Sequence, residues 1–320
     1  MEKQPEVIRD KACMRAWSRR LRFEEGKEKR SLALVPTMGF LHEGHLSLIR
    51  EARAYADLTV VSIYVNPGQF SPSEDLASYP SDLRGDLRKL SEVGGVDAVF
   101  CPGNLYDYGS SDGVVNEGVF AAPTVPAEEA KASSCLEDGG SGHESWIRVE
   151  SLERGLCGKS RPVFFRGVAT VVAKLFNIVE PDVAIFGKKD YQQWRLICRM
   201  VRDLDFAVKI IGSEIVREVD GLAMSSRNVR LLHGERDKAL SIYKALSEAK
   251  SAGLNGQSTC QEIKDLVVQT VSKAGGKIDY AEIVEQESLT PVDQINCPVV
   301  ICIAAWFGNV RLIDNIEINA

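Results

Sequence analysis

The chain has 320 residues, of which 44% are hydrophobic and 26% are charged, and its formal net charge is -6. This length exceeds what one hydrophobic core usually organises, so we expect a globular protein of two domains. The acidic balance argues against a general nucleic-acid or membrane-surface binder, because counterion release requires clustered basic residues. No apolar run approaches the roughly 20 residues that span a bilayer, and the longest, at 298–307, suits a buried strand.

Residues 1–10 contain acids and lack both an apolar signal core and the composition of a transit peptide, so a cytosolic location is expected. Eight cysteines are scattered without a C-x-x-C pair, which predicts reduced thiols packed in or near the core.

The first two-thirds of the chain alternates apolar, Val- and Ile-rich runs with amphipathic stretches. Such runs are typical of parallel strands that are covered by helices on both faces. The expected elements, in chain order, are a helix at 10–23, a strand at 32–38, a helix at 45–55, a strand at 59–65, a helix at 81–93, a strand at 96–100, a helix at 167–179, a strand at 182–186, a helix at 190–203 and a strand at 208–211. The pattern predicts a doubly wound, Rossmann-like α/β domain over residues 1–215.

Residues 103–142 interrupt this order with Gly, Ser, Ala and acidic residues, and we interpret them as a long insertion. A solvated loop is the simplest interpretation, and a regulatory or subunit-contact role is the alternative. Residues 216–320 predict a smaller α+β domain, with helices at 235–252 and 260–273 and a strand at 277–284. Residues 298–318 predict a hairpin that turns at Gly308 and Asn309.

The first candidate motif, at 36–45, lies where the first long strand passes into a helix. Its glycines allow close backbone approach, and a helix N-terminus attracts anions. His42 and His45 lie one turn apart, so both imidazoles can donate to phosphate oxygens without a permanent charge. A zinc site would need further ligands, and the remaining histidines, His143 and His233, lie in unrelated contexts.

Two further motifs carry positive charge in an acidic chain. Lys188 and Lys189 follow the strand at 182–186 and a glycine, which favours phosphate contact over simple solvation. Residues 220–228 place two serines before Arg227, and this arrangement can wrap a triphosphate, although an ordinary polar loop would have the same composition.

The fourth motif, at 66–70, follows the second long strand. Asn66 and Gln69 could hydrogen-bond the hydroxyl and carboxylate groups of a small polar substrate, although a plain turn explains the sequence equally well. Three of the four motifs follow parallel strands, where open α/β sheets bind ligands. We therefore expect one shared crevice and phosphate-centred chemistry without a protein nucleophile.

The turn His42-x-Gly-His45 is typical of the nucleotidyltransferase superfamily that includes class I aminoacyl-tRNA synthetases. Together, the stretches 36–45, 64–70, 186–193 and 220–228 resemble the signature set of pantothenate synthetases, from about residue 31 to the C-terminus. The resemblance implies ATP-dependent condensation of pantoate with β-alanine through an acyl-adenylate, with release of AMP and pyrophosphate. The insertion resembles that of plant-type members, which implies a cytosolic homodimer.

The resemblance also implies roles for individual residues. The residues with an implied catalytic role are His42, His45, Lys189 and Arg227. ATP binding falls on Met38, Gly39, Phe40, Leu41, His42, Glu43, Gly44, His45, Gly187, Lys188, Lys189, Asp190, Val216, Met224, Ser225, Ser226 and Arg227. Pantoate binding falls on Asn66, Gln69, Tyr79 and Gln193, with Gln69 also near β-alanine. Asp86 matches an acid close to a catalytic magnesium ion, so ATP and Mg²⁺ are the expected cofactors.

The chain departs from the bacterial pattern at Phe164, where His is usual, and at Lys188, where Glu is common. Two other functions compete with this interpretation. A different adenylate-forming or cytidylyl-transferring enzyme would carry its own acceptor motifs, which are not visible. A non-catalytic nucleotide-binding regulator would bind ATP without substrate-dependent release of pyrophosphate, but the full set of His, Lys, Ser and Arg side chains favours an enzyme.

Overall fold

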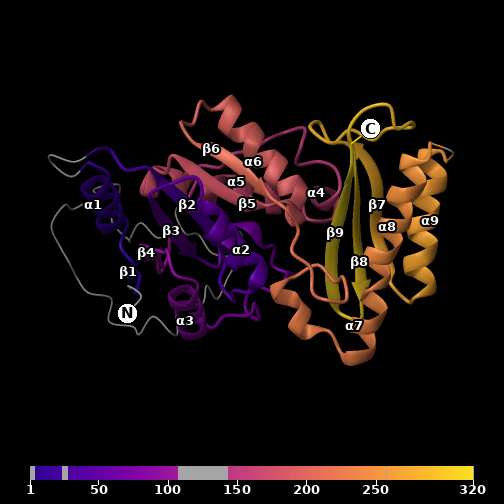
Figure 1. Ribbon diagram of the computed structural model, residues 1–320, viewed down its shortest axis with the longest axis horizontal. Helices are drawn as coiled ribbons and strands as arrows, with labels where there is room; N and C mark the ends of the chain where they lie inside the picture. The colour runs from indigo at the N-terminus through magenta and orange to yellow at the C-terminus, as the bar shows by residue number, and fades with distance from the viewer. Residues whose placement is uncertain (1–3, 24–27, 107–142, 257, 320) are drawn as a thin grey trace.

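The computed structural model describes residues 4–23, 28–106, 143–256 and 258–319, and it contains two sheets that lie side by side (Figure 1). The larger sheet has six strands, all parallel, in the order β1-β4-β3-β2-β5-β6. Its strands are β1 (Glu6–Ile8), β2 (Leu32–Thr37), β3 (Leu58–Ile63), β4 (Ala98–Phe100), β5 (Val183–Gly187) and β6 (Lys209–Ser213). The order reverses between β2 and β5, which is where an open α/β sheet forms a crevice.

Helices cover both faces of this sheet. Leu32 and Leu34 contribute to a core with α1 (Lys11–Arg22), α5 (Phe164–Val179) and α6 (Tyr191–Asp203). Ala33 and Val35, which alternate with them, pack instead towards α2 (Glu43–Ala52) and α3 (Leu83–Val93). Because successive side chains of a strand point to opposite faces, an unbroken apolar run serves both cores.

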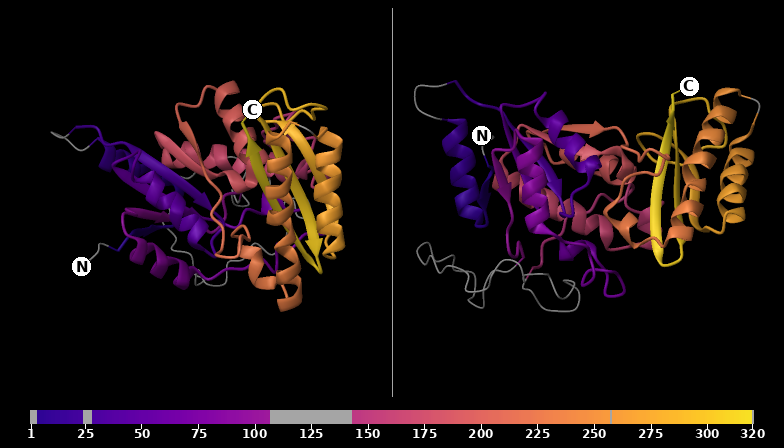
Figure 2. Two further views of the ribbon diagram at one scale, coloured as in Figure 1. Left: turned by 45° about the vertical axis from the view of Figure 1, so that its right-hand side comes forward. Right: turned by 60° about the horizontal axis from the view of Figure 1, so that its bottom comes forward.

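The smaller sheet is antiparallel, in the order β7-β8-β9. Its strands are β7 (Lys277–Glu285), β8 (Val299–Phe307) and β9 (Val310–Ile318). Figure 2 shows α8 (Ser241–Leu254) and α9 (Cys260–Lys273) on its outer side, where they form a separate apolar core. On the inner side, Val284, Val300 and Cys302 pack against Leu156 and Tyr191 of the larger part. The small sheet therefore lies between its own helices and the parallel-sheet domain.

The predicted α/β class with a small α+β C-terminal part is confirmed, and the hairpin turns at Gly308, whose φ is +56°. The predicted helix at 235–252 is wrong in one respect, because it is divided at Leu240 into α7 (His233–Ala239) and α8. Strand β1 and the four-residue helix α4 (Cys157–Ser160) were not predicted from the sequence. The expected insertion lies outside the described residues from position 107 onward. No helix in the described ranges has the length and apolar character needed to cross a membrane.

Candidate active site

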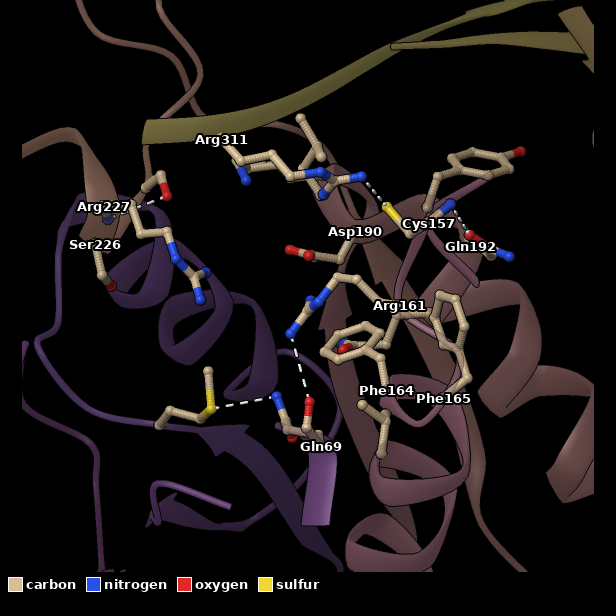
Figure 3. Close-up of a pocket in the computed structure, with 18 of the residues that line it drawn as sticks. Gln69, Cys157, Arg161, Phe164, Phe165, Asp190, Gln192, Ser226, Arg227 and Arg311 are labelled. Carbon is tan, nitrogen blue, oxygen red and sulfur yellow. Dashed lines mark hydrogen bonds between the residues drawn. The ribbon is translucent and has the colours of Figure 1, made fainter. Parts of the chain in front are cut away.

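A cleft of about 700 Å³ opens at the carboxyl ends of β2 and β5 and extends to the inner side of the small sheet. Its walls come from the loop after β2 and from three short 3₁₀ helices: η1 (Pro67–Gln69), η2 (Lys188–Asp190) and η3 (Ser226–Arg230). Residues of α4, α5 and β9 complete the cleft. Figure 3 shows Arg161, Arg227 and Asp190 projecting towards its centre from different elements.

The loop after β2 has an unusual backbone that a buried carboxylate holds in place. Gly39 and Phe40 have positive φ values of +84° and +51°. The N–H groups of Phe40 and Leu41 donate to the two carboxylate oxygens of Asp86, at 2.8 and 2.7 Å. Lys89 also donates to the carbonyl oxygen of Leu41, at 2.5 Å. Asp86 thus accepts hydrogen bonds from two backbone N–H groups that no helix or strand satisfies.

The two histidines stand at the start of α2, with His42 as the residue before the helix and His45 in its first turn. Their ring centroids lie 4.1 Å apart. Burial, together with the nearby Lys189 and Lys89, lowers the pKa of His42 to about 4, and burial with the neighbouring His42 lowers the pKa of His45 to about 3. Both rings are therefore neutral at physiological pH.

The backbone N–H of His42 donates to Nδ1 of His45 at 3.3 Å. A neutral imidazole that accepts at Nδ1 carries its proton on Nε2. His45 thus offers one hydrogen-bond donor without a charge. Gly44 allows the rings this close approach, because a Cβ there would lie 2.9 Å from Cε1 of His42.

The two adjacent lysines of η2 have different environments. Lys188 donates to Glu214 and, at 3.1 Å, to Glu317 of β9, and it does not line the cleft. Two carboxylates thus already neutralise Lys188, and the geometry of the cleft gives no support to its expected role in ATP binding. Lys189 does line the cleft, and no carboxylate in the described parts of the chain forms an ion pair with it.

Strand β9 holds the backbone of this lysine turn. The side-chain amide of Asn315 donates to the carbonyl oxygens of Lys188 and Lys189, at 2.9 and 3.0 Å. The adjacent Asp314 receives a two-pronged ion pair from Arg217, at 2.6 and 2.9 Å. Burial raises the pKa of Asp314, and the guanidinium of Arg217 partly offsets this effect. The small sheet therefore lines the cleft and also holds the backbone of the turn that carries Lys189.

The η3 turn reaches the cleft from the other side. Ser226 Oγ donates to the carbonyl oxygen of Phe40 at 3.2 Å, which ties η3 to the histidine loop. Arg227, at 3.1 Å, and Arg230 both form ion pairs with Asp75. The guanidinium of Arg227 also lies 5.3 Å from the ring centroid of Tyr79. Segments that are more than 150 residues apart therefore meet at this end of the cleft.

Sequence reasoning missed the apolar wall that α5 and its flanks give to the cleft, because a buried helix face carries no chemical motif. This wall consists of Phe164, Phe165, Val168, Val171, Val172 and Leu175. It also missed Arg161, which pairs with Glu74 and lies 3.8 Å above the ring of Phe164. Phe164 thus packs against a cation.

Most of the residues expected at the site line the cleft. Those that do are Met38, His42, Gly44, His45, Asn66, Gln69, Tyr79, Gly187, Lys189, Asp190, Gln193, Val216, Met224, Ser225, Ser226 and Arg227. Those outside its lining are Gly39, Phe40, Leu41, Glu43, Asp86 and Lys188. Glu43 instead pairs with Arg50 on the surface of α2. Gly39, Phe40 and Leu41 shape the loop that presents the histidines.

Asp86 does not fit the expected magnesium site. Its side chain is 1% exposed, and both oxygens accept backbone hydrogen bonds. Burial raises the pKa of this carboxyl, although the bonds from Leu41 and Phe40 act against the rise. No group of three or more metal-binding side chains occurs among the residues that the structure describes.

Comparison with known proteins agrees with this geometry. A family model described as Pantoate-beta-alanine ligase matches residues 6–317. The pantoate–β-alanine ligase of Oryza sativa subsp. japonica is 64% identical and that of Arabidopsis thaliana 62% identical, each with at least 98% of both chains covered. The pantothenate synthetase structure from Thermus thermophilus has a TM-score of 0.80 at 35% identity, covering 98% of this chain and 100% of that one.

The pantoate–β-alanine ligase structure from Francisella tularensis, which is complexed with β-γ ATP and β-alanine, has a TM-score of 0.70 at 29% identity and covers 98% of this chain and 97% of that one. These relatives match the whole cleft region and both sheets, and the family match spans nearly the full length. The chain therefore belongs to the pantoate–β-alanine ligase family and is an enzyme of that class.

Proposed function

We propose that this ligase activates pantoate with ATP inside the cleft and then transfers the pantoyl group to β-alanine. The observation that carries the proposal is the distribution of charge. Among the residues that the structure describes, four arginines line the cleft, and each pairs with a carboxylate: Arg161, Arg227, Arg230 and Arg311. Lys189 also lines the cleft, but in the described residues no carboxylate forms an ion pair with it. A single uncompensated cation beside two neutral imidazole donors suits a phosphate chain.

ATP lies across the carboxyl ends of β2 and β5 in this proposal. Its phosphates receive hydrogen bonds from Nε2 of His45 and lie at the N-terminus of α2, whose backbone dipole favours an anion. Lys189 contacts the same phosphates, and Val216, with residues 224–227, borders the nucleotide. Arg227 shares its charge with Asp75, so it contributes most when phosphate oxygens replace part of that ion pair.

Pantoate lies beside η1 and the apolar wall of α5. The wall suits the two methyl groups that pantoate carries, while Gln69 and Gln193 provide hydrogen bonds to its hydroxyl and carboxylate groups. The side chain of Gln69 donates from Nε2 to the sulfur of Met38 at 3.3 Å, a weak acceptor that a substrate oxygen can replace.

In the first step a pantoate carboxylate oxygen attacks the α-phosphorus of ATP, and the bond from that phosphorus to the bridging oxygen of pyrophosphate breaks. Lys189 and His45 stabilise the charge that moves onto pyrophosphate. In the second step the neutral amine of β-alanine attacks the acyl carbon, AMP leaves, and the amine loses a proton to solvent. Residues 216–320, which include the small sheet, act as a lid domain in this proposal and shield the mixed anhydride from water.

The proposal is tested by measuring pyrophosphate and AMP with each substrate alone and with both. Pantoate alone should give at most one pyrophosphate per site, and AMP turnover should require β-alanine as well. Lys189→Gln should lower pyrophosphate formation by at least about 100-fold, since it removes a charge-assisted contact of the transition state. The matched variant Lys188→Gln should stay within about threefold of wild type. Equal losses in both variants would contradict the assignment.

We assign no step to magnesium, because the expected ligand Asp86 does not face the cleft; Mg²⁺ is held mainly by nucleotide phosphates in many ATP enzymes. We also propose that the enzyme is a homodimer in the cytosol, on the strength of its resemblance to plant-type members. Light scattering of the purified chain would test the first point, and imaging of a tagged chain in cells would test the second.

A further inference from the structure

Tyr106 occupies a buried position from which its hydroxyl reaches the substrate pocket through other side chains. The hydroxyl donates to Oδ1 of Asn66 at 2.9 Å, and both residues are almost fully buried. The amide nitrogen of Asn66 then donates to Oε1 of Gln69 at 2.9 Å. Three polar side chains thus form a continuous path from the end of β4 to the cleft.

The backbone fixes the direction of every bond in this path. Oδ1 of Asn66 also accepts the N–H of Gly68 at 3.3 Å, and its amide nitrogen also donates to the carbonyl oxygen of Gly167 at 3.1 Å. A backbone N–H only donates and a carbonyl only accepts, so the amide of Asn66 has one possible orientation. Its nitrogen must face Gln69.

The orientation of Gln69 follows from that of Asn66. Because Oε1 of Gln69 accepts from Asn66, its NH₂ group is the end that remains for the cleft. Gln69 therefore presents donors, which suit carboxylate and hydroxyl oxygens, and it presents no acceptor that would repel them. A hydroxyl that donates to Oδ1 polarises the Asn66 amide and strengthens the donation from its nitrogen.

The surroundings of Tyr106 hold its ring in place. Its N–H donates to Oδ1 of Asn104 at 2.8 Å, and the ammonium of Lys174 lies 5.0 Å from the ring centroid. The rings of His143 and Trp146 pack against it, with centroids at 4.8 and 6.2 Å. These contacts use the backbone N–H or the ring of Tyr106, so removing the hydroxyl alone should leave them intact.

We infer that Tyr106 is a positioning residue for pantoate, which acts through Asn66 to hold the donor end of Gln69 towards the substrate. The inference rests on the proposed binding of pantoate at Gln69. Tyr106 does not touch substrate and takes no part in the chemical step. Its effect should therefore appear in pantoate affinity and be absent from ATP affinity.

The test compares Tyr106→Phe with wild type in steady-state kinetics. The expected result is a rise of about 5- to 10-fold in KM for pantoate, the effect of about one lost hydrogen bond, with KM for ATP within twofold. A structural role alone would lower thermal stability and active fraction but leave the pantoate KM unchanged. An unchanged pantoate KM, or an equal rise in both KM values, would overturn the inference.

A double-mutant cycle separates action through Gln69 from general loosening. In a Gln69→Met background, which keeps the length but removes the amide, adding Tyr106→Phe should change the pantoate KM by less than twofold. A full additive effect there would also overturn the inference. Failure of the proposed function itself would appear separately, as wild-type enzyme that forms no AMP when pantoate and β-alanine are supplied.

Discussion

Replacement of Asp86 distinguishes a loop-holding role from a metal-binding role. Asp86→Asn keeps the shape of the side chain but turns one acceptor into an NH₂ group that faces a backbone N–H. The 2.8 and 2.7 Å bonds to Phe40 and Leu41 are charge-assisted, and loss of one should cost about 1.5–3 kcal/mol. For a chain of 320 residues each kcal/mol lowers Tm by about 1–2 °C, so we expect a fall of roughly 2–6 °C.

The same change should lower kcat, because the loop between Gly39 and Leu41 leads directly into the histidine pair. The Mg²⁺ concentration for half-maximal activity should remain within twofold of wild type. Asp82→Asn is the matched control: Asp82 caps the same helix through Gly85 at 2.9 Å but does not touch the loop. If Asp86→Asn kept the wild-type Tm while its Mg²⁺ requirement rose tenfold or more, the loop-holding role would be refuted.

Three further outcomes are expected. The folded-state pKa values of His45 (about 3) and His42 (about 4) lie below the ordinary 6.5, so both rings stay neutral above about pH 5. As the pH drops from 6.5 towards 4, the unfolded chain binds these two protons before the folded chain does, so the free energy of unfolding should fall. The pH profile of kcat/KM for ATP should show no inflection near pH 6.5 that depends on His45, which a comparison with His45→Asn would check. Asn315→Asp removes both donors to the η2 carbonyls, and kinetics and calorimetry should show kcat lowered at least tenfold and stability lowered by about 2–4 kcal/mol. Gly167→Ala would place a Cβ 2.0 Å from the carbonyl oxygen of Gly68, so KM for pantoate should rise and Tm should fall, whereas wild-type values for both would contradict this close approach of the two backbones.

The sequence predicted most of the fold and much of the site, because both depend on local signals. Apolar runs identified every strand of the parallel sheet except β1, whose three residues are too few to form a pattern. Motifs at strand ends identified the loops that meet at the cleft, since parallel strands bring their carboxyl ends to one edge.

Contacts between distant side chains could not be predicted in this way. Adjacent lysines look alike in sequence, and the ion pairs with Glu214 and with Glu317 of β9 are what separate Lys188 from Lys189. The resemblance implied that Asp86 lies close to a magnesium ion, and its burial under the loop is a tertiary property that has no local signal in the sequence. Tyr106 lies within residues 103–142, which we interpreted as an insertion, so its contact with Asn66 had no local signal.

The two sides of the cleft are bridged by contacts of unequal strength, and this bears on how the small sheet could move. At β9, Asn315 is 4% exposed, and breaking its two bonds to the η2 carbonyls would leave buried groups unsatisfied. At η3, the ion pairs of Asp75 with its two arginines involve side chains that are 26–28% exposed, and water can replace them at little cost. Opening of the cleft should therefore begin at η3 and pivot about β9, so that Lys189 keeps its place while nucleotide enters and leaves.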